Sequence, residues 1–486
     1  MANVIGELLI HEGLISEAQL VQALACQQRQ LLACQQMDRN RLGDALIALG
    51  FITANQLDAF FNPVPQVPLK IANTGLSETF LVDLLLKAAY LEGGTFTLKQ
   101  ASDALSLSFS IIDELVSLVK NQQLASVRSA SGYSLSTQIF DLTRSGREKA
   151  EIAFGISRYV GAAPVPLRDY ARILAQQTVR QVEVDDEWIH HSLRHMVIGE
   201  KMLGQLGPAF CSGRSVFFYG PPGTGKTSIS ETLGNALPGQ IYIPKAIEVG
   251  GQVIRLFDSA IHFSVEVETA ESPHLDLRMS LKHDPRWKKC RRPVVMVGGE
   301  LTLDMLDLRF DPISKFYEAP IHMKAGNGIF ILDDFGRQQV EPRQLLNRWI
   351  VPLERGSDFQ TLNTGLKFEI PFDQITVFCT NMRPRDLVDE AFLRRIRHKI
   401  QVKYQTEDEF KEILRRVCNA QGITYDEVVA EYLIDNFYRK AGRSLSGSHP
   451  RDIVEHIVDR ARFMRRHPEL TTEAVDLAAT SYFVEM

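Results

Sequence analysis

The chain contains a glycine-rich loop of the kind that binds phosphate groups. The loop runs Gly220-Pro-Pro-Gly-Thr-Gly-Lys226-Thr227 and fits the pattern G-x-x-x-x-G-K-[ST]. The apolar run 215–219 before it predicts a buried strand, and Ile229, Leu233 and Leu237 after it predict one face of a helix. A strand, a glycine turn and a helix direct backbone N–H groups and the positive helix end toward a phosphate chain. The sequence therefore predicts that this chain binds a nucleoside triphosphate.

Two residues of this loop have defined roles in phosphoryl transfer. Lys226 is expected to reach the β- and γ-phosphates, and the hydroxyl group of Thr227 is expected to ligate Mg²⁺. The rest of the loop would surround the phosphates with backbone N–H groups. The residues expected to contact ATP are Gly220, Pro221, Pro222, Gly223, Thr224, Gly225, Lys226, Thr227 and Ser228.

Two later apolar runs end in polar residues that suit the same reaction. Residues 328–332 precede Asp333 and Asp334, and residues 375–380 precede Asn381. A carboxylate at a strand end beside the phosphate loop can act through Mg²⁺, which is the role expected of Asp333. Asp334 would orient and polarise the attacking water, and Asn381 would hydrogen-bond the γ-phosphate or that water. Each run alone could be an ordinary core strand with a polar end, but the three in this order favour an ATPase.

The order of these strand ends resembles that of the AAA+ ATPases, and the resemblance extends from about residue 175 to the C-terminus. The polar ends correspond to the family's Walker A, Walker B and sensor 1 motifs. The run 325–333 is similar to the approach to Walker B in the subgroup of MoxR-type and enhancer-binding ATPases. The resemblance implies an α/β core with a parallel sheet, followed by a helical lid.

Arginines and one altered acid complete the site that the resemblance implies. The segment 390–397 is similar to the part of the family that supplies arginine fingers to a neighbouring subunit, so Arg394 and Arg395 are the expected fingers. Arg451 lies in what resembles the sensor 2 helix and is expected to contact the γ-phosphate. The family usually has Asp-Glu at Walker B, whereas Asp334 is one methylene shorter. Hydrolysis is therefore expected to be slow, or its water to be placed slightly differently.

The N-terminal part of the chain contains a duplicated segment. Residues 4–20 match residues 41–57 with a period of 37 residues (41 − 4). The segment resembles the N-terminal domain of type II secretion and type IV pilus ATPases, some of which bind cyclic di-GMP. Arg41, Leu42 and Gly43 match the start of that family's motif, but the end of the second copy departs from it. Two interpretations stay open, a cyclic di-GMP site and a protein-docking module.

Residues 77–155 have the pattern of a winged-helix domain. Three helical stretches are followed by short β-type runs and by Leu-Thr-x-x-Gly (142–146) before a charged helix. Such domains often bind DNA, but the expected recognition helix, 109–121, has two acids and one lysine. The wing is more basic and carries Arg128, Arg144, Arg147 and Lys149. We expect a protein-contacting domain, and a continuous basic face on it would reverse that expectation.

Composition limits the other functions. The chain has 486 residues, a net charge of −5 and 45% hydrophobic residues, which is typical of a soluble protein of several domains. This charge gives no general argument for nucleic acid or anionic membranes as partners. The sequence lacks a run of ~18 apolar residues, a signal peptide and a C-x-x-C pair among its six cysteines. We therefore expect a protein of the reducing cytoplasm, without membrane insertion.

The expected fold class is multidomain α/β. The expected parts are a helical duplicate (1–62), a linker (63–76), a winged-helix-like domain (77–155), a second linker (156–174), an AAA+ core (175–402) and a helical lid (403–486). The expected function is hydrolysis of ATP, with Mg²⁺, by a ring of subunits of hexamer size that remodels or assembles a protein partner. The alternative is a nucleotide-gated DNA-binding regulator that uses the winged helix.

Overall fold

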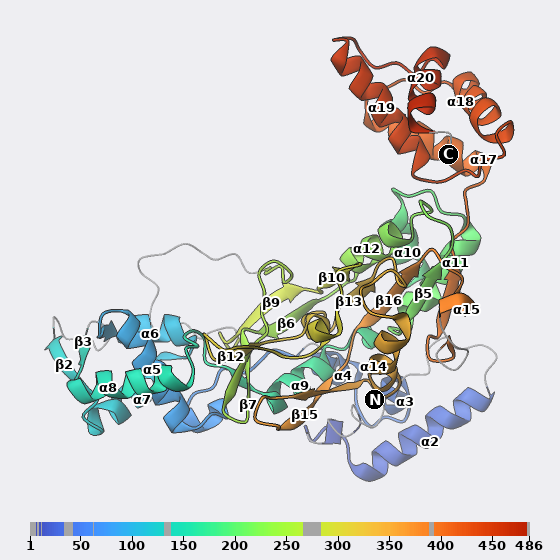
Figure 1. Cartoon of the computed structure of the whole chain (residues 1–486). Helices are drawn as coiled ribbons and strands as arrows, with labels where there is room; N and C mark the ends of the chain where they lie inside the picture. The colour runs from blue at the N-terminus through green and yellow to red at the C-terminus, as the bar shows by residue number, and fades with distance from the viewer. Residues whose placement is uncertain are drawn as a thin grey trace.

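The computed structural model describes residues 6, 9–10, 12–33, 42–61, 63–130, 138–265, 283–387 and 393–483. Figure 1 shows an elongated molecule with an α/β core in the middle, residues 78–156 at one end and the C-terminal helices projecting from the other. The N-terminal helices lie beside the core, away from the C-terminal helices. Hydrogen bonds connect the core to each of these three parts.

The N-terminal segment folds as two similar helical units. In each unit a helix ends at a glycine with positive φ, Gly13 (70°) or Gly50 (71°). Ser16 or Thr53 then caps the next helix through hydrogen bonds with a glutamine three residues later. Equivalent residues are 37 positions apart (50 − 13), so the repeat in the sequence is also a repeat in the structure. The helices here are α2 (Glu17–Ala33), α3 (Leu42–Ala48) and α4 (Ala54–Phe61).

The next domain consists of a helix, a strand, two helices, a hairpin and a last helix. Its elements are α5 (Glu78–Leu91), β1 (Thr95–Thr97), α6 (Leu98–Leu105), α7 (Phe109–Asn121), β2 (Ala125–Ala130), β3 (Gln138–Leu142) and α8 (Arg144–Ile156). The strands form an antiparallel sheet in the order β1-β3-β2. Helix α7 buries Ile111, Ile112 and Leu115 in the domain core, which leaves its polar residues on the opposite face. A short 3₁₀ helix, η1 (Ile71–Thr74), precedes the domain.

A second sheet, which the sequence did not lead us to expect, joins this domain to the core. Its order is β11-β12-β8-β7-β4. Its strands are β4 (Val165–Pro166), β7 (Ala246–Val249), β8 (Gln252–Arg255), β11 (Arg309–Asp311) and β12 (Phe316–Glu318). The segment 156–174, expected as a linker, supplies β4 and most of α9 (Leu167–Gln176), whose Tyr170 and Ile173 pack against this sheet. Two strand pairs lie nearby, β6 (Gln240–Pro244) with β9 (Trp287–Arg291) and β14 (Ser357–Thr361) with β15 (Lys367–Pro371).

The core sheet has five parallel strands in the order β10-β13-β16-β5-β17. They are β5 (Val216–Tyr219), β10 (Val294–Val297), β13 (Ile329–Leu332), β16 (Ile375–Thr380) and β17 (His398–Gln401). The helices around this sheet are η3 (Val179–Gln181), α10 (Asp186–Leu193), α11 (Glu200–Cys211), α12 (Lys226–Ala236), η4 (Leu303–Leu306), α13 (Ile321–Lys324), α14 (Pro342–Arg355) and α15 (Pro384–Leu387).

Helices cover both faces of this core sheet. Val216 and Phe218 of β5 pack in one apolar cluster with α10, α11 and α12, whereas Phe217 packs in another with α14. The alternation follows from the two-residue period of a strand. Because all five strands are parallel, their carboxyl ends lie at one edge of the sheet, where ligands of such sheets bind.

The C-terminal helices fold around an apolar cluster of their own. They are α17 (Glu407–Ala420), α18 (Glu427–Ile434), the π-helical turn η5 (Asp435–Arg439), α19 (His449–Phe463) and α20 (Thr472–Tyr482). Phe410, Leu433 and Ile453 are fully buried within this cluster. In the part of the chain that the structure describes, every helix is too short or too polar to cross a membrane.

Candidate nucleotide-binding site

The phosphate loop connects β5 to α12 at the carboxyl edge of the core sheet. Gly220, Gly223 and Gly225 have φ values of 148°, 71° and 90°. A Cβ atom on Gly220 would lie 1.9 Å from the carbonyl oxygen of Val402, so this position requires glycine. Gly225 is the N-cap of α12, which places the start of the helix directly after the loop. This is the backbone arrangement that binds phosphate groups.

The other loop residues differ in exposure. Thr224 is buried, and its hydroxyl group donates a hydrogen bond to the carbonyl oxygen of Pro221 at 2.9 Å. Pro222 lies at the exposed tip of the loop, and Ser228 is exposed in the first turn of α12. Thr224 therefore stabilises the loop from inside, while the tip is open to solvent.

Lys226 is 7% exposed, and three oxygen atoms surround its ammonium group. Nζ donates to the carbonyl oxygens of Gly220 at 3.0 Å and Pro221 at 2.7 Å, and to Oδ1 of Asn381 at 2.7 Å. Burial lowers the pKa of Lys226, and nearby negative groups, including Asp333, oppose that shift. The ammonium group has three donors and no acceptor, so it can exchange these partners for phosphate oxygens.

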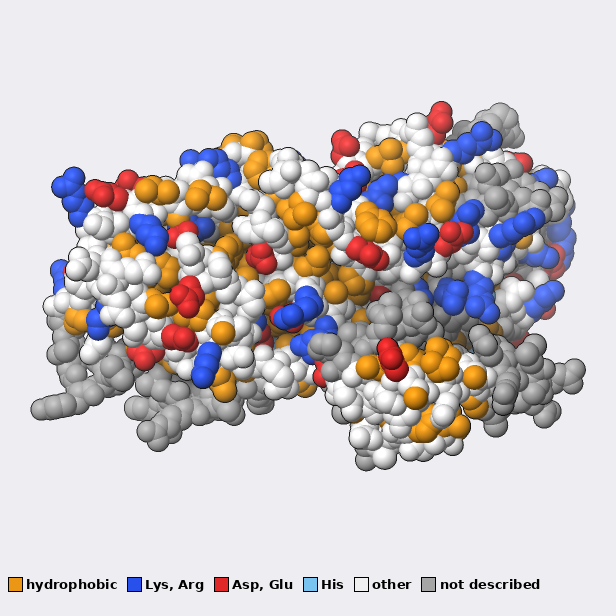
Figure 2. All heavy atoms as spheres, turned by 90° about the horizontal axis from the view of Figure 1, so that it is seen from below, with side chains coloured by type: hydrophobic (Ala, Val, Ile, Leu, Met, Phe, Trp, Pro, Cys, Tyr) orange, Lys and Arg blue, Asp and Glu red, His pale blue; other side chains and the backbone are white. Residues whose placement is uncertain are grey.

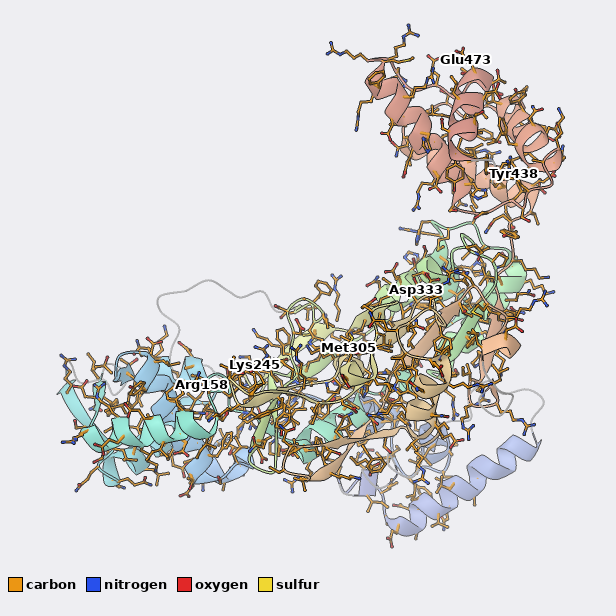
Figure 3. The ribbon with its side chains drawn as sticks, viewed as in Figure 1. Arg158, Lys245, Met305, Asp333, Tyr438 and Glu473 are labelled. Carbon is orange, nitrogen blue, oxygen red and sulfur yellow. The ribbon has the colours of Figure 1, made fainter. Side chains whose placement is uncertain are left out.

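Thr227 and Asp333, the two residues expected to bind Mg²⁺, are in contact with each other. Oγ1 of Thr227 donates to Oδ1 of Asp333 at 2.8 Å. Asp333 follows β13 directly and lies at the end of the core that faces the C-terminal helices (Figure 3). A hydroxyl group and a carboxylate fit Mg²⁺, which takes its other ligands from water and phosphate. The described residues include no group of three or more His, Cys, Asp or Glu that could hold a metal.

Asp334 and Asn381 are also joined by a hydrogen bond, from Nδ2 of Asn381 to Oδ1 of Asp334 at 2.8 Å. Asp334 has left-handed backbone geometry (φ 46°), which Asp and Asn tolerate better than other non-glycine residues. Gln338, which sequence analysis did not identify, holds this turn by donating to the carbonyl oxygens of Asp333 and Asp334 at 2.9 and 3.3 Å. The structure thus brings together Lys226, Thr227, Asp333, Asp334 and Asn381.

The C-terminal helices contact the phosphate loop through two serines that sequence analysis missed. Oγ of Ser446 and the backbone N–H of Ser448 donate to the carbonyl oxygen of Gly223 at 2.9 and 3.2 Å. A Cβ atom on Gly223 would lie 2.3 Å from Oγ of Ser446, so the contact is close. The available signal was a short polar run before a helix, which is too common to identify a contact.

The three expected arginines lie apart from this group. Arg451 is in the first turn of α19, and its side chain is 67% exposed. Arg394 is exposed, and Arg395 forms an ion pair with Glu354. Arg394 and Arg395 precede β17 and so lie at the amino edge of the core sheet, opposite to the phosphate loop. Residues 388–392 of the same segment are outside the described residues.

In the N-terminal repeat, packing accounts for two of the three residues expected to bind cyclic di-GMP. Leu42 is buried in the core of the repeat. A Cβ atom on Gly43 would lie 2.6 Å from the side chain of Leu57, so glycine permits the close approach of two helices. Arg41 lies outside the described residues. The structure therefore gives Leu42 and Gly43 a role in folding.

Sequence comparisons match parts of the chain. A family model described as a domain of unknown function (DUF8689) matches residues 406–481, which are the C-terminal helices. A protein of Methanothermobacter thermautotrophicus, named as a 26S proteasome regulatory subunit homolog, is 24% identical over 193 residues. That match covers 37% of this chain and 47% of the relative, so the chain spans less than half of the relative's length.

Solved structures of three other proteins show some likeness to this chain. The Thermotoga maritima RuvB Holliday junction branch migration motor is 13% identical, with a TM-score of 0.31, over 62% of this chain and 71% of its own. Domain III of the Thermotoga maritima replication initiation protein DnaA is 13% identical, with a TM-score of 0.33; the match covers 63% of this chain and 100% of the DnaA chain. Brucella abortus NtrX in complex with ADP is 12% identical, with a TM-score of 0.33; the match covers 75% of this chain and 59% of the NtrX chain. Likenesses of this size add nothing to the assignment of the site.

The fold of the core follows from its own geometry. A parallel sheet carries a phosphate loop after its first strand, β5, and polar residues after β13 and β16, all at one edge. A helical domain follows and touches the loop. Together with the partial match to the proteasome regulatory subunit homolog, these features give an AAA+ ATPase-like fold.

Proposed function

We propose that this chain, whose core has an AAA+ ATPase-like fold, binds ATP with Mg²⁺, hydrolyses it, and uses hydrolysis to remodel or assemble a protein partner. The observation that carries the proposal is the contact of Lys226 with Asn381, which in turn donates to Asp334, beside the contact of Thr227 with Asp333. Cation, amide and carboxylates meet around the N-terminus of α12, where a triphosphate would lie.

Each residue of the group has a role that its contacts support. The loop N–H groups and Lys226 bind the phosphates, and Thr227 and Asp333 supply oxygen ligands for Mg²⁺. The metal, when bound, neutralises charge on the phosphates. Asp334 accepts a proton from the attacking water, and Asn381 holds Asp334 in position while its own oxygen faces Lys226. Because the side chain of Asp334 already accepts a hydrogen bond from Asn381, the site accommodates aspartate where the family usually has glutamate.

The position of the arginines supports hydrolysis in a ring. Arg394 and Arg395 lie at the amino edge of the core sheet, a strand's length from the phosphate loop of their own subunit. They are therefore suited to contact the nucleotide of a neighbouring subunit, as arginine fingers do in trans. A ring of hexamer size would give every site such a neighbour.

The charges of the 78–156 domain favour a protein partner over DNA. Arg128 lies 3.6 Å from a carboxylate oxygen of Asp141, and Arg144 lies 3.0 Å from one of Glu148. Lys149 donates to the side chain of Gln122 at 3.4 Å. Figure 2 shows basic and acidic side chains intermixed over this domain, at the left of the view. The continuous basic face that DNA binding requires is therefore not present on the face shown.

The chain itself covers the start of the helix that would read DNA. Oγ of Ser108 and Oγ of Ser110 donate to the carbonyl oxygens of Pro68 and Leu69 at 3.1 and 3.0 Å. A carboxylate oxygen of Glu114 accepts from the backbone N–H of Ile71 at 3.0 Å. Entry of α7 into a groove would break these contacts, so we assign the domain a protein-docking role.

The substitution Lys226→Ala tests the assignment. We expect kcat/KM for phosphate release to fall about 100-fold or more, because the cation nearest the β- and γ-phosphates is removed. Binding of a fluorescent ATP analogue should weaken in the same variant. Lys201→Ala changes an exposed lysine of α11 and serves as the matched control. Turnover by Lys226→Ala equal to that of the control would disprove the proposed site.

A further inference from the structure

A cavity of about 980 Å³ lies between the N-terminal repeat and the core. Leu9, Leu42, Leu57 and Phe61 of the repeat form an apolar wall. The core lines the other side with both basic and acidic residues, the acidic ones being Glu183, Asp185, Asp186 and Glu354. The two parts are also joined by an ion pair between Arg172 and Glu12 at 3.3 Å. Small-molecule sites in proteins usually measure roughly 300–1,000 Å³. The cavity is therefore large enough for a ligand of nucleotide size.

This cavity is separate from the phosphate loop. Arg214 precedes β5 and Arg397 precedes β17, and these two strands pair in parallel with His398 opposite Val216. Both arginines therefore lie at the amino edge of the core sheet. The phosphate loop lies at the carboxyl edge. A ligand in the cavity could not be the nucleotide held by the loop.

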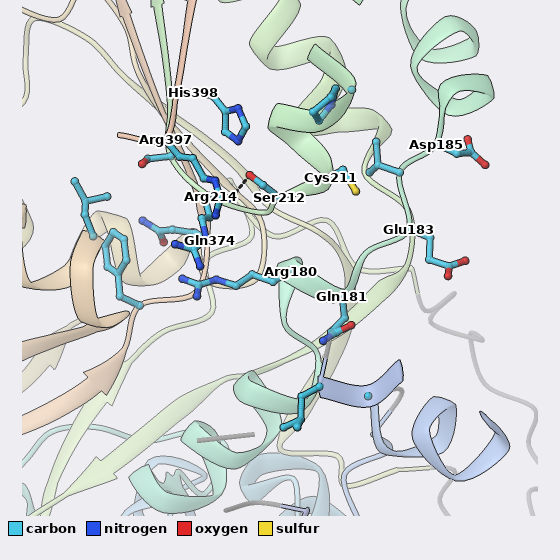
Figure 4. Close-up of a pocket in the computed structure, with 18 of the residues that line it drawn as sticks. Arg180, Gln181, Glu183, Asp185, Cys211, Ser212, Arg214, Gln374, Arg397 and His398 are labelled. Carbon is cyan, nitrogen blue, oxygen red and sulfur yellow. Dashed lines mark hydrogen bonds between the residues drawn. The ribbon is translucent and has the colours of Figure 1, made fainter. Parts of the chain in front are cut away.

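Three guanidinium groups gather on one side of the cavity. Figure 4 shows Arg180, Arg214 and Arg397 close together, with Glu183 and Asp185 on the opposite side and directed away from them. Among the described residues, no carboxylate forms an ion pair with Arg214 or Arg397, while Arg180 lies 3.7 Å from a carboxylate oxygen of Asp373. Like charges held this close repel one another, and a bound anion would relieve the repulsion.

The titration of neighbouring groups reflects this crowding. Burial lowers the pKa of Arg214, and the charges of Arg180 and Arg397 lower it further. Burial lowers the pKa of His398 as well, and Arg397, Lys399 and Arg214 add to that shift. Nε2 of His398 is buried without a hydrogen-bond partner among the described residues, and Nε of Arg180 is buried with only its ion pair to Asp373 at 3.7 Å.

We propose that this cavity binds a phosphate-bearing small molecule of about nucleotide size, with its oxygens on Arg180, Arg214 and Arg397 and its less polar part on the N-terminal repeat. Guanidinium groups suit this task because their planar forks bind phosphate oxygens in pairs. An apolar wall together with a cluster of three arginines matches a ligand with a ring and a negatively charged group. Such a ligand bridges the repeat and the core.

The ligand would also contact the segment that carries the expected arginine fingers. Arg395 and Arg397 both line the cavity, on either side of the buried Ile396. Occupancy would fix this segment relative to the core and so change hydrolysis by the neighbouring subunit. This regulatory consequence rests on the proposed function, whereas the binding itself does not.

Calorimetry of the full chain with inorganic pyrophosphate tests the binding. The Lys226→Ala background weakens binding at the phosphate loop and makes the result independent of ATPase activity. We expect saturable heat, and a loss of affinity of at least about tenfold on adding Arg214→Ala or Arg397→Gln, since each removes a charged hydrogen bond. Arg168→Ala, an exposed arginine whose side chain is 86% accessible, is the matched control outside the cavity.

Several outcomes would overturn the proposal. One is the absence of heat at millimolar pyrophosphate, and another is equal affinity in the cavity variants and the control. Tight binding of a glutamate-rich peptide in place of pyrophosphate would identify a protein ligand and also overturn it. Arg214→Lys guards against misfolding, because it keeps the charge and should retain part of the affinity. Equal loss in Arg214→Lys and Arg214→Ala, with a lowered melting temperature in both, would mean that Arg214 serves the fold.

Discussion

Replacing Asp334 by asparagine tests the catalytic role of the turn after β13. The change removes a negative charge and keeps the shape of the side chain. The new amide oxygen can still accept the hydrogen bond that Nδ2 of Asn381 donates to Oδ1 of Asp334 at 2.8 Å. Lys226, Thr227 and Asp333 keep their contacts, so ATP binding should be retained. Only the ability to accept a proton from the attacking water is lost.

The size of the effect follows from that single loss. A positioned general base contributes about 10²–10⁴ in rate, so kcat should fall by that factor while the Kd for ATP stays within about threefold. Phosphate release at saturating ATP measures kcat, and a fluorescent ATP analogue measures Kd. Asp459→Asn, at an exposed position in α19, is the matched control. A kcat for Asp334→Asn close to that of the control would refute the role of Asp334.

The substitution Asp334→Glu tests whether the shorter acid at the Walker B position suits this site or slows hydrolysis. Asp334→Glu moves the carboxylate about 1.5 Å outward, one C–C bond, past its present contact with Asn381. It also places glutamate at a φ of 46°, which costs roughly 1–2 kcal/mol for residues other than Gly, Asn and Asp. We therefore expect kcat to fall, by up to about 100-fold. A rise in kcat would show instead that Asp334 slows hydrolysis.

Two further predictions concern assembly and pH. Mixing inactive Lys226→Ala subunits with inactive Arg394→Ala or Arg395→Ala subunits should restore phosphate release, because some interfaces then pair an intact phosphate loop with an intact arginine finger. Such a finger in trans is worth about 10³–10⁵ in rate. A lack of recovery in mixtures that do form rings would exclude this arrangement. Burial by itself would raise the pKa of Asp358, but hydrogen bonds from His322 and Arg348 hold that pKa well below its ordinary value. The folded pKa is depressed, so its stabilisation is present above the unfolded pKa of about 3.9 and is lost as pH falls below it. Urea unfolding should therefore show a smaller loss of unfolding free energy between pH 7 and pH 3 for Asp358→Asn than for the unaltered chain, and equal losses would contradict the role of this group.

Local patterns in the sequence were enough to predict the centre of the candidate site. The phosphate loop needs glycines at fixed positions, and each polar strand end directly follows its apolar run, so Lys226, Asp333 and Asn381 could be identified without knowing the pairing of the strands. The repeat at the N-terminus was equally visible, because its caps recur 37 positions apart (50 − 13). These features depend on neighbours within a few residues along the chain.

Only the tertiary structure revealed the features that depend on contacts between segments far apart in the sequence. The second sheet escaped prediction because β4 has two residues and pairs with β7, about eighty positions later, so neither strand carries a clear pattern by itself. Ser446 reaches Gly223 only because the C-terminal helices fold back onto the loop. Arg214 and Arg397 are 183 positions apart (397 − 214), and the parallel pairing of β5 with β17 makes them neighbours. Sequence patterns record local backbone preferences, whereas the cavity and its charge arise from which strands lie side by side.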